Sequence, residues 1–460
     1  MRRDRFQVII ITVFLLGLCF AVPQFVFGQT KKDRAQAKIF VDQGDQAFQQ
    51  KNYAAAADKF GQAIALVPNY PVVHFRKGYA HYFLKQYDQA LNEFALALSQ
   101  GFKPLEVYRV RYFIYYEQKD YDAALSDIQN GLQLEPNDLN LLKALGGIYL
   151  ERKSYSDSLA AFQRAAKIAP EDGDIDYNVG LVQRALGDTK SQGVAAETAV
   201  QKGTRFMGDA YFLLGDADQK QRNFTGAIDA YQRSINAKPD RYDTYLLLAD
   251  VFRNENRFTD AIGALKQGLK VFPNDGLFYT NLSWYYSLAG RPDDAVQAAK
   301  AGIQLLPKES TAYTNLCRAY NETKNFDLAI TACNSALKLN PGDGESYFYL
   351  ARAYDFTKRT VDATRYYGLA VTGLLDFTKK NPDYSDGWYL LGNAYYASGK
   401  KDKAIEAYLQ CLALSPKFAK ARYNLGHVYV SNNNKTGAIE QYNILLTLDA
   451  ALAARLKEEM

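Results

Sequence analysis

Small, aromatic and proline residues recur along this chain every 34 positions. The period is clearest in two runs of prolines. Within each run the prolines are 34 residues apart: Pro136 and Pro170 form the first run, and Pro239, Pro273, Pro307 and Pro341 form the second. When this proline takes position 32 of a 34-residue unit, twelve units tile residues 37–452. A repeat of this length predicts one small structural unit stacked many times, because a single unit cannot bury its apolar face alone.

Each unit carries two apolar stripes with helical spacing. Positions 4, 7, 8 and 11 share one face of a first helix, A, and positions 20, 24 and 27 share one face of a second helix, B. Position 8 is glycine in seven units and position 20 is alanine in ten, so the two helices can approach closely while aromatic residues at positions 11 and 24 fill the gaps. The proline at position 32 ends helix B, because it lacks an N–H and clashes with the preceding turn. The pattern predicts an all-α chain of helix pairs.

These columns resemble the tetratricopeptide repeat family, and the resemblance covers residues 37–452. The resemblance implies a right-handed superhelical solenoid of about twelve helix-turn-helix repeats, with the A helices lining a concave groove. It also implies binding of a protein or an extended peptide segment rather than catalysis, without a cofactor.

Three departures from the pattern carry further expectations. The unit at residues 173–206 has Gln192 in the alanine column and Thr204 in place of proline, so we expect its second helix to be short or irregular. This unit is either a joint between arrays 37–206 and 208–452 or simple drift of the repeat. The tenth unit carries seven extra residues, placed at 378–384, and we expect them to lengthen its second helix by two turns.

The last residues of the chain predict a capping helix. Asp449 is a helix N-cap residue, and Leu452 and Leu456 form an apolar stripe behind it. We therefore expect residues 453–460 to close the end of the solenoid with a polar outer face, as a stack of repeats requires.

The N-terminal segment has the pattern of an export signal. Arg2, Arg3 and Arg5 precede an apolar run at residues 8–22, and Gly28 supplies the small residue expected before a cleavage site. We expect residues 1–28 to be a signal peptide and residues 29–36 a short linker, which places the protein in the periplasm or outside the cell. The alternative is an uncleaved anchor at residues 8–27, with the body still outside the cytoplasm.

Charge and cysteine content narrow the function classes. The chain has 55 Lys and Arg against 50 Asp and Glu, a formal charge of +5, which is too even for a nucleic-acid binder with a basic face. Only four cysteines are present, which argues against a disulfide scaffold. Cys317 and Cys333 occupy positions 8 and 24 of one unit, so they form either a disulfide or two small core residues. Cys411 is then an unpaired buried thiol.

The search for catalytic or metal-binding residues yields no strong motif. His74 and His81 stand seven residues apart, roughly 10 Å along a helix, which is too far to share a metal without other ligands. Three aspartates at 172–176 begin like a calcium loop, but Tyr177 stands where such a loop needs glycine. We therefore expect helix-capping acids there, no metal site and no enzyme activity.

The A-helix positions that face the expected groove are rich in aromatic and polar residues. Asn281 and Asn315 share position 6, where an amide can grip an extended backbone, and Arg318 and Arg352 share position 9, where they can hold a carboxylate. Residues 281–427 are thus expected to bind an acidic or C-terminal peptide segment. The candidate partner-binding residues are Asn281, Trp284, Asn315, Arg318, Arg352, Tyr389, Asn393, Asn424 and His427, with Phe75, Tyr79, Tyr82, Arg109, Phe113 and Tyr116 in an earlier stretch.

Two other functions stay open beside this one. The chain can instead be a structural component of a cell-envelope assembly or secretion complex that acts through its outer face. Aromatic residues in a groove can also stack on sugars. No nucleic-acid partner is expected, and contact with a membrane is expected only through an uncleaved N-terminal segment.

Overall fold

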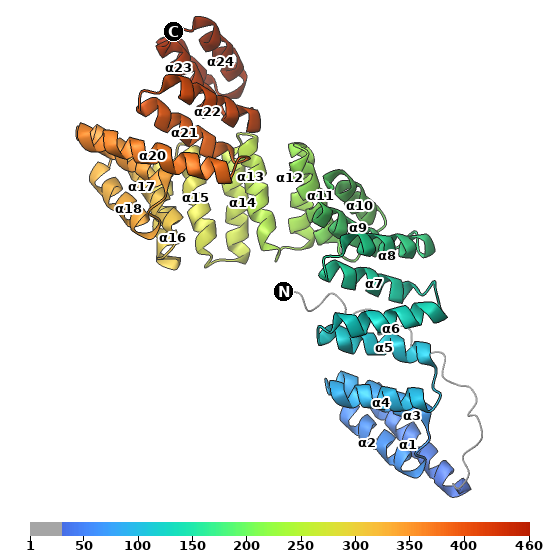
Figure 1. Ribbon diagram of the computed structural model, residues 1–460. Helices are drawn as coiled ribbons and strands as arrows, with labels where there is room; N and C mark the ends of the chain where they lie inside the picture. The colour runs from blue at the N-terminus through green and yellow to red at the C-terminus, as the bar shows by residue number, and fades with distance from the viewer. Residues whose placement is uncertain (1–29) are drawn as a thin grey trace. The chain divides into compact units, whose positions relative to one another are not determined.

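The computed structural model describes residues 30–460, which form twenty-five helices and no strand (Figure 1). The expected all-α fold is therefore confirmed. The helices of the first half are α1 (Lys31–Gln49), α2 (Tyr53–Leu66), α3 (Pro71–Phe83), α4 (Tyr87–Ser99), α5 (Pro104–Glu117), α6 (Tyr121–Leu134), α7 (Leu139–Glu151), α8 (Tyr155–Ile168), α9 (Gly173–Leu186), α10 (Thr189–Gln201), α11 (Met207–Lys220) and α12 (Phe224–Ala237). Those of the second half are α13 (Tyr242–Asn254), α14 (Phe258–Val271), α15 (Gly276–Leu288), α16 (Pro292–Leu305), α17 (Ser310–Glu322), α18 (Phe326–Leu339), α19 (Gly344–Phe356), α20 (Thr360–Lys380), α21 (Ser385–Ala397), α22 (Lys401–Leu414), α23 (Ala419–Ser431), α24 (Lys435–Leu448) and α25 (Ala450–Glu459).

Odd-numbered helices up to α23 are the A helices, and the helix that follows each one is its B partner. In five of the seven units with glycine at position 8, that glycine meets the aromatic ring of position 24 in the same pair; Gly180 and Gly426 meet other side chains or backbone instead. A Cβ on Gly44 would lie 2.6 Å from the Phe60 ring, and one on Gly392 would lie 2.5 Å from the Tyr408 ring. The alanines of position 20 are fully or almost fully buried. The small and aromatic columns of the sequence are therefore the contact between the two helices of a pair.

A second periodic feature lies in the turn between A and B. Position 15 has a positive φ in every one of the twelve units, including Lys119 at 63° and Gly399 at 73°. The residue is glycine in three units and a longer residue in nine. A left-handed residue lets the chain reverse tightly after helix A, and it costs a residue with a Cβ about 1–2 kcal/mol. Position 15 therefore keeps a left-handed backbone conformation in every unit, whether or not its residue is glycine.

The expectation of an irregular helix in the fifth unit is wrong. α10 is a regular helix of 13 residues, capped by Asp188, whose side chain accepts from the Ser191 N–H. Gln192, in the alanine column, is buried and its amide donates to Leu213 O and to the Asp216 carboxylate, both at 2.8 Å. Because this buried amide has partners, a large polar residue is accommodated without breaking the helix.

The extra residues of the tenth unit lengthen a helix, as expected. α20 has 21 residues, whereas the neighbouring B helices α18 and α22 have 14 each. It crosses α19 at a glycine pair, since a Cβ on Gly373 would lie 2.7 Å from the Gly344 Cα. The close crossing directs the added turns of α20 toward the A-helix side of the repeats.

Both ends of the described chain are capped helices. α25 closes the array, with Asp449 accepting from the Ala451 and Leu452 N–H groups and Leu456 fully buried. α1 begins at Lys31 with a capping box between Thr30 and Asp33, so residues 31–36, expected to be a linker, are helical. The expected signal or anchor segment lies outside the described residues.

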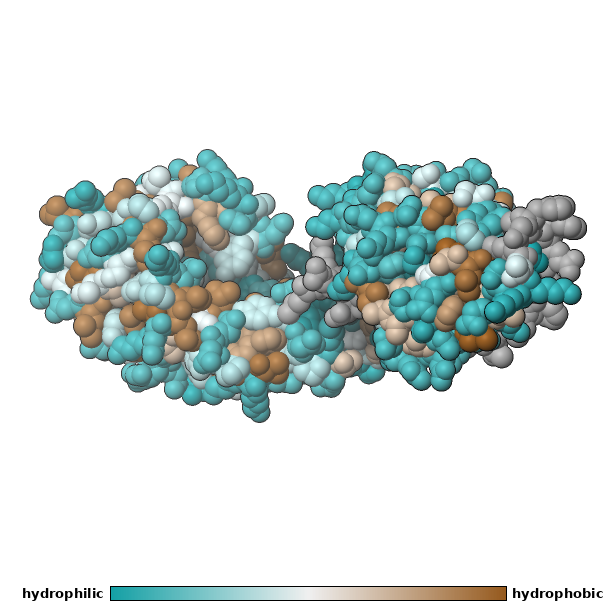
Figure 2. Space-filling view, turned by 90° about the horizontal axis from the view of Figure 1, so that it is seen from below, coloured by the Kyte–Doolittle hydropathy of each residue, from teal (hydrophilic) through white to brown (hydrophobic). Residues whose placement is uncertain are grey.

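The chain divides into two compact units, one up to Ile168 and one from Ala169 onward. The core of the first unit is a series of small clusters around buried aromatic and aliphatic side chains such as Phe60, Phe94 and Ile128. The second unit has two larger clusters, around Tyr245 and around Tyr354. On the visible face of each unit, apolar residues are interspersed with polar ones, as expected for amphipathic helix pairs (Figure 2).

Cys317 and Cys333 are joined by a disulfide, with their Cα atoms 5.2 Å apart. They replace the glycine and aromatic residue that meet at positions 8 and 24 in other pairs. Cys411 is a free, buried cysteine.

One buried polar cluster stabilises the first unit. The Glu93 carboxylate lies 2.6 Å from His74 Nδ1 and 2.7 Å from Lys77 Nζ. Burial alone would raise the pKa of Glu93, but these two hydrogen bonds outweigh it and lower the pKa below its usual value. His74 therefore has a structural role here, since its other ring nitrogen lies 3.1 Å from Pro68 O.

Candidate functional site

The A helices of the second unit surround a cavity of about 870 Å³. Its walls come from α15, α17, α19 and α21, together with the added turns of α20 and the start of α23. Because successive A helices stand side by side, residues one or more repeats apart in sequence face the same space. The cavity is thus a direct product of the repeat.

Seven of the nine candidate residues predicted in this stretch line the cavity. They are Asn281, Trp284, Asn315, Arg318, Arg352, Tyr389 and Asn393. Asn424 is next to it and donates to Asn393 Oδ1 at 2.7 Å. The register of the repeats was therefore sufficient to bring most of these candidates to one cavity.

The amide groups at position 6 do not form a free ladder. Asn315 is buried, and its Nδ2 donates to Thr280 O of the preceding A helix at 2.9 Å. Asn281 Nδ2 donates to Leu277 O of its own helix at 2.8 Å. One N–H of each amide is therefore engaged within the protein, and the expectation that the pair grips a peptide backbone stays a prediction.

The two arginines at position 9 differ in their surroundings. The Arg318 side chain is buried, pairs through Nη2 with Glu345, and lies 5.7 Å from the Trp284 ring and 5.3 Å from the Tyr349 ring. Its Nε and Nη1 have no hydrogen-bond partner among residues 30–460. Arg352 is half-buried and lies 5.7 Å from the Phe356 ring. Both residues line the cavity, but the unpartnered nitrogens of Arg318 are themselves buried.

A tyrosine and two amides form a hydrogen-bonded group beside the arginines. Asn393 Oδ1 accepts from Tyr408 OH and from Asn424 Nδ2, each at 2.7 Å, and the Tyr389 hydroxyl accepts weakly from the same Asn424 amide. Burial raises the pKa of Tyr389, so its hydroxyl stays neutral at physiological pH. The group fixes the orientation of the Tyr389 ring at the cavity wall.

His427 belongs to the end cap instead of the cavity. Its Nδ1 lies 2.6 Å from the Glu459 carboxylate of α25, and its Nε2 lies 2.9 Å from Tyr396 OH. The terminal helix therefore pairs with a residue that the repeat register alone places in the groove, and the His427 side chain stays 40% exposed.

The candidates in the first unit form a separate set, and two of them are core residues. Phe75 and Phe113 are buried, so they have little surface to offer a partner. Arg109 is held by Asp138 and Glu135, each at 2.6 Å. The half-buried tyrosines Tyr79, Tyr82 and Tyr116 remain at the surface of this unit, and burial raises the pKa of Tyr82 to about 12.

The second unit contains a contact that the sequence did not predict. Its later repeats touch its earlier ones, and α21 lies beside α13 (Figure 1). Here Arg253 Nη1 donates to Ser385 Oγ at 3.2 Å and pairs with the buried Asp386, while its other nitrogens pair with Asp250. We call this contact the seam. Its other members are the pairs Asn254 with Ser415, Glu255 with Lys417, and Arg222 with the Ala413 carbonyl.

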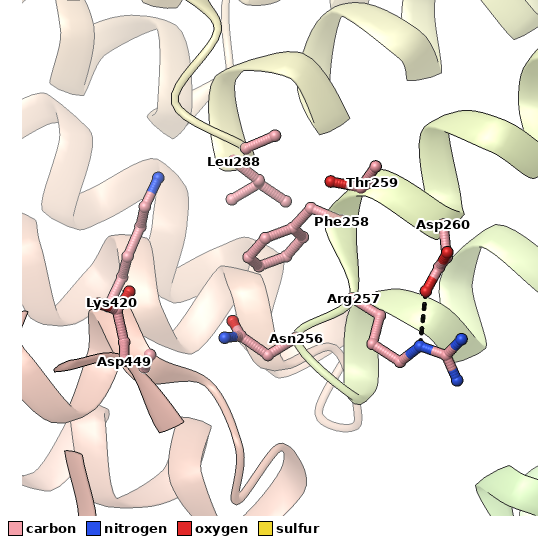
Figure 3. A pocket seen from close by; sticks show the side chains of 10 residues that line it. Asn256, Arg257, Phe258, Thr259, Asp260, Leu288, Lys420 and Asp449 are labelled. Atoms are coloured by element: carbon pink, nitrogen blue, oxygen red, sulfur yellow. Dashed lines mark hydrogen bonds and ion pairs between the residues drawn. The ribbon is translucent and has the colours of Figure 1, made fainter. Parts of the chain in front are cut away.

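A smaller pocket of about 460 Å³ opens along the seam. Figure 3 shows Lys420 and Asp449, from the C-terminal repeats, on one side and Asn256, Phe258 and Leu288 on the other. Lys420 lines both this pocket and the larger cavity, and its ammonium donates to Ser287 O at 3.3 Å. Burial lowers the pKa of Lys420, Glu322 and Asp449 oppose this shift, and Arg318 adds to it.

Over residues 30–460, no group of three or more His, Cys, Asp and Glu side chains has an arrangement that holds a metal ion. No helix in the same range is long and apolar enough to cross a membrane.

Comparisons with known structures give distant, all-helical similarities. The chain is similar to the crystal structure of yeast Tom70, with 16% identity, 93% of this chain and 94% of that one covered, and a TM-score of 0.40. It is also similar to the Cut9–Hcn1 hetero-tetramer of the APC/C, with 14% identity, 92% of this chain and 96% of that one covered, and a TM-score of 0.35. The MamA protein has 24% identity over 38% of this chain and 94% of its own, with a TM-score of 0.33. No curated protein matches the chain.

Family models give a stronger result. Models described as tetratricopeptide repeat match residues 47–111, 115–177, 212–276, 246–310, 287–353 and 419–452, and one described as TPR repeat matches 392–433. Together they cover more than half of the sequence. Proteins built from this repeat generally mediate protein–protein interactions, and the scaffold is typically non-enzymatic. The chain belongs to the tetratricopeptide repeat family.

Proposed function

We propose that this chain is an exported, non-enzymatic interaction scaffold that holds an extended segment of a partner protein in the cavity of its second unit. The observation that carries the proposal is the composition of the cavity wall. Aromatic rings, amides and two arginines converge there from four repeats, and Arg318 has two nitrogens without a hydrogen-bond partner among residues 30–460. An extended peptide offers both apolar side chains and backbone polar groups, and such a mixed wall suits it.

The size of the cavity supports a peptide rather than a folded domain. About 870 Å³ is in the range of small-ligand pockets and fits a few residues of an extended chain. Aromatic residues such as Trp284 and Tyr389 supply large contact areas at low entropic cost, and the arginines supply charge-assisted hydrogen bonds. Export is proposed from the N-terminal pattern of the sequence alone.

The first test is capture of partners from the native cell envelope, with identification by mass spectrometry. Wild-type protein and an Arg318→Ala/Arg352→Ala variant are compared, after circular dichroism has shown that the variant keeps its helices. Loss of the specific partner from the variant supports the proposal. Unchanged affinity of the purified partner for the folded variant removes the cavity from consideration.

The export part of the proposal has its own test. Sequencing the N-terminus of the native protein should return Gln29 as the first residue. A sequence from residues 1–20 would instead show that the segment is retained as an anchor.

A further inference from the structure

The B helices of two neighbouring repeats, α18 and α20, expose large apolar side chains to solvent. Val361 is 86% exposed and Leu328 is 50% exposed, and each stands in the first turn of its helix. The other eleven units have Asp, Thr, Ser, Lys or Ala in the column of Val361, and Asp, Ala, Gly, Ser, Gln or Lys in that of Leu328. The repeat itself therefore does not require an apolar residue at either position, and these two side chains need another explanation.

Two more apolar side chains extend this surface. Phe356, the last residue of α19, is exposed and stacks on Phe326, the first residue of α18, with ring centroids 5.0 Å apart. This contact brings the start of α18 to the turn that leads into α20. Leu369 is exposed about two turns further along α20 than Val361. We call Leu328, Phe356, Val361 and Leu369 the outer patch, and none of the four lines the cavity.

The hydroxyl groups of the same two helices are already hydrogen-bonded. Thr331 and Ser335 of α18 each donate to a backbone carbonyl of their own helix at 3.0 Å. Thr364 and Thr372 of α20 do the same at 2.9 Å and 3.2 Å. Interfaces between proteins carry about one hydrogen bond per 100–200 Å². A surface whose hydroxyl donors are used within its own helices favours instead a partner that contributes apolar contact, such as the interfacial region of a lipid bilayer.

The charges around the outer patch indicate which surface it fits. Residues 323–339 and 355–380, which form α18, α20 and the turns before them, contain seven Lys or Arg and four Asp. Two of these acids are paired within the group, Asp362 with Arg359 and Asp376 with Lys380. An excess of basic residues around exposed apolar side chains is typical of a surface that binds anionic lipid. The same excess disfavours a second copy of this chain, because two basic rims repel each other.

We propose that the outer patch binds the interfacial region of an anionic lipid bilayer, with its apolar side chains among the headgroups and the surrounding lysines and arginines on the phosphates. The inference goes beyond the proposed function, because the cavity is lined by none of the four patch residues. It is also separate from the membrane contact expected through an uncleaved N-terminal segment. The helices lie on the bilayer in this account and do not cross it.

The first experiment measures flotation of the protein with lipid vesicles. It uses residues 29–460, which contain every described helix and lack the apolar N-terminal run. The vesicles are made of phosphatidylcholine alone or of equal parts phosphatidylcholine and phosphatidylglycerol. We expect binding to the mixed vesicles, little binding to the neutral ones, and weaker binding as the salt concentration rises. Equal binding to both kinds of vesicle, or binding to neither, would overturn the inference.

The variant Val361→Asp places in the patch a residue that five other units carry in the same column, so the helix pair should still form. We expect binding to the mixed vesicles to weaken at least about fivefold, because one charge near an anionic surface changes the binding free energy by about 1 kcal/mol. Val194→Asp is the matched control, since Val194 is exposed on α10 and Asp also occurs in its column. It should bind as wild type does, and circular dichroism verifies that both variants fold. Unchanged binding in Val361→Asp, or an equal loss in both variants, would contradict the account.

Insertion of the patch is measured separately from charge attraction. A nitrobenzoxadiazole label is attached to Val361→Cys or to Val194→Cys, each with Cys411→Ala, which removes the free cysteine of the described chain. With mixed vesicles, the label at position 361 should shift its emission to shorter wavelength and be quenched by spin-labelled lipid, and the label at position 194 should do neither. The absence of both changes at position 361 would show that the patch does not enter the bilayer.

A protein partner is the alternative occupant of the outer patch. A protein that binds wild type but not Val361→Asp, while neither kind of vesicle binds, would overturn the lipid assignment. These outcomes leave the proposed function untouched, because Val361→Asp alters no residue that lines the cavity. Failure of a partner segment to bind in the cavity likewise leaves the outer patch to be judged by the vesicles alone.

Discussion

The contact between the glycine of position 8 and the ring of position 24 can be tested by adding a single methyl group. Gly392 lies on α21, and a Cβ there would be 2.5 Å from the Tyr408 ring. Tyr408 is 1% exposed, and its hydroxyl donates to Asn393 at 2.7 Å. The ring is therefore enclosed at one end and tethered at the other, so it cannot move aside without breaking a contact.

The expected magnitude follows from two opposing terms. Relieving the overlap requires a shift of about 1 Å in a packed core, which places the cost near the upper end of the 1–3 kcal/mol range for overpacking. Replacing glycine by alanine inside a helix returns about 1 kcal/mol. We therefore expect Gly392→Ala to lower the free energy of unfolding by about 2 kcal/mol.

A matched control isolates the overlap from the change in helix propensity. Gly263 lies inside α14 of the same unit, it is exposed, and a Cβ there would meet nothing within 4 Å. Gly263→Ala should thus raise the free energy of unfolding by about 1 kcal/mol. Urea unfolding followed by circular dichroism compares the midpoints of the two variants with wild type. Two shifts in the same direction would refute the idea that position 8 is glycine because of the ring it faces.

Three further outcomes are expected. In urea unfolding, Gly399→Ala should lower the free energy of unfolding by about 1 kcal/mol and Lys119→Gly should raise it by about 0.5 kcal/mol, because position 15 has a positive φ in both turns. Changes of the same sign and size in the two variants would contradict this. Glu93→Gln should be less stable at neutral pH but lose less stability between about pH 5 and about pH 3, since a carboxyl with a lowered pKa stabilises above its unfolded pKa and stops doing so as it is protonated. Intact mass after alkylation should show Cys317 and Cys333 protected until a reductant is added, and reduction should cost about 3 kcal/mol in urea unfolding for a separation of 16 residues; alkylation of both without reductant would exclude the bridge.

The sequence predicted those features that repeat. Helix pairs, their contact columns and the two added turns of α20 follow from a pattern that occurs many times, so one irregular unit does not obscure it. Most of the candidate residues in residues 281–427 line one cavity for the same reason, because the register of residues such as Arg318 and Arg352 is set by the period. The structure also shows why Gln192 does not disrupt its helix, through hydrogen bonds to the next repeat that no local pattern reveals.

The seam and its consequences could not be predicted in this way. Arg253 and Asp386 stand 133 positions apart, and whether they meet depends on the angles between all the repeats in between. No residue type marks such a contact in the sequence. The same limit explains why the register did not show that Phe75 is buried among neighbouring side chains or that His427 pairs with Glu459 of the terminal helix.

The central claim is that a partner segment occupies the cavity of the second unit, and site-specific photo-crosslinking tests it most directly. A photoreactive phenylalanine derivative replaces Trp284, inside the cavity, or Leu409, a residue of α22 that is 47% exposed and does not line the cavity. Each full-length protein is irradiated in the native envelope, and the crosslinked peptides are sequenced. The account predicts that position 284 captures a short contiguous segment of one partner and that position 409 does not. Capture of a partner from position 409 alone would contradict it.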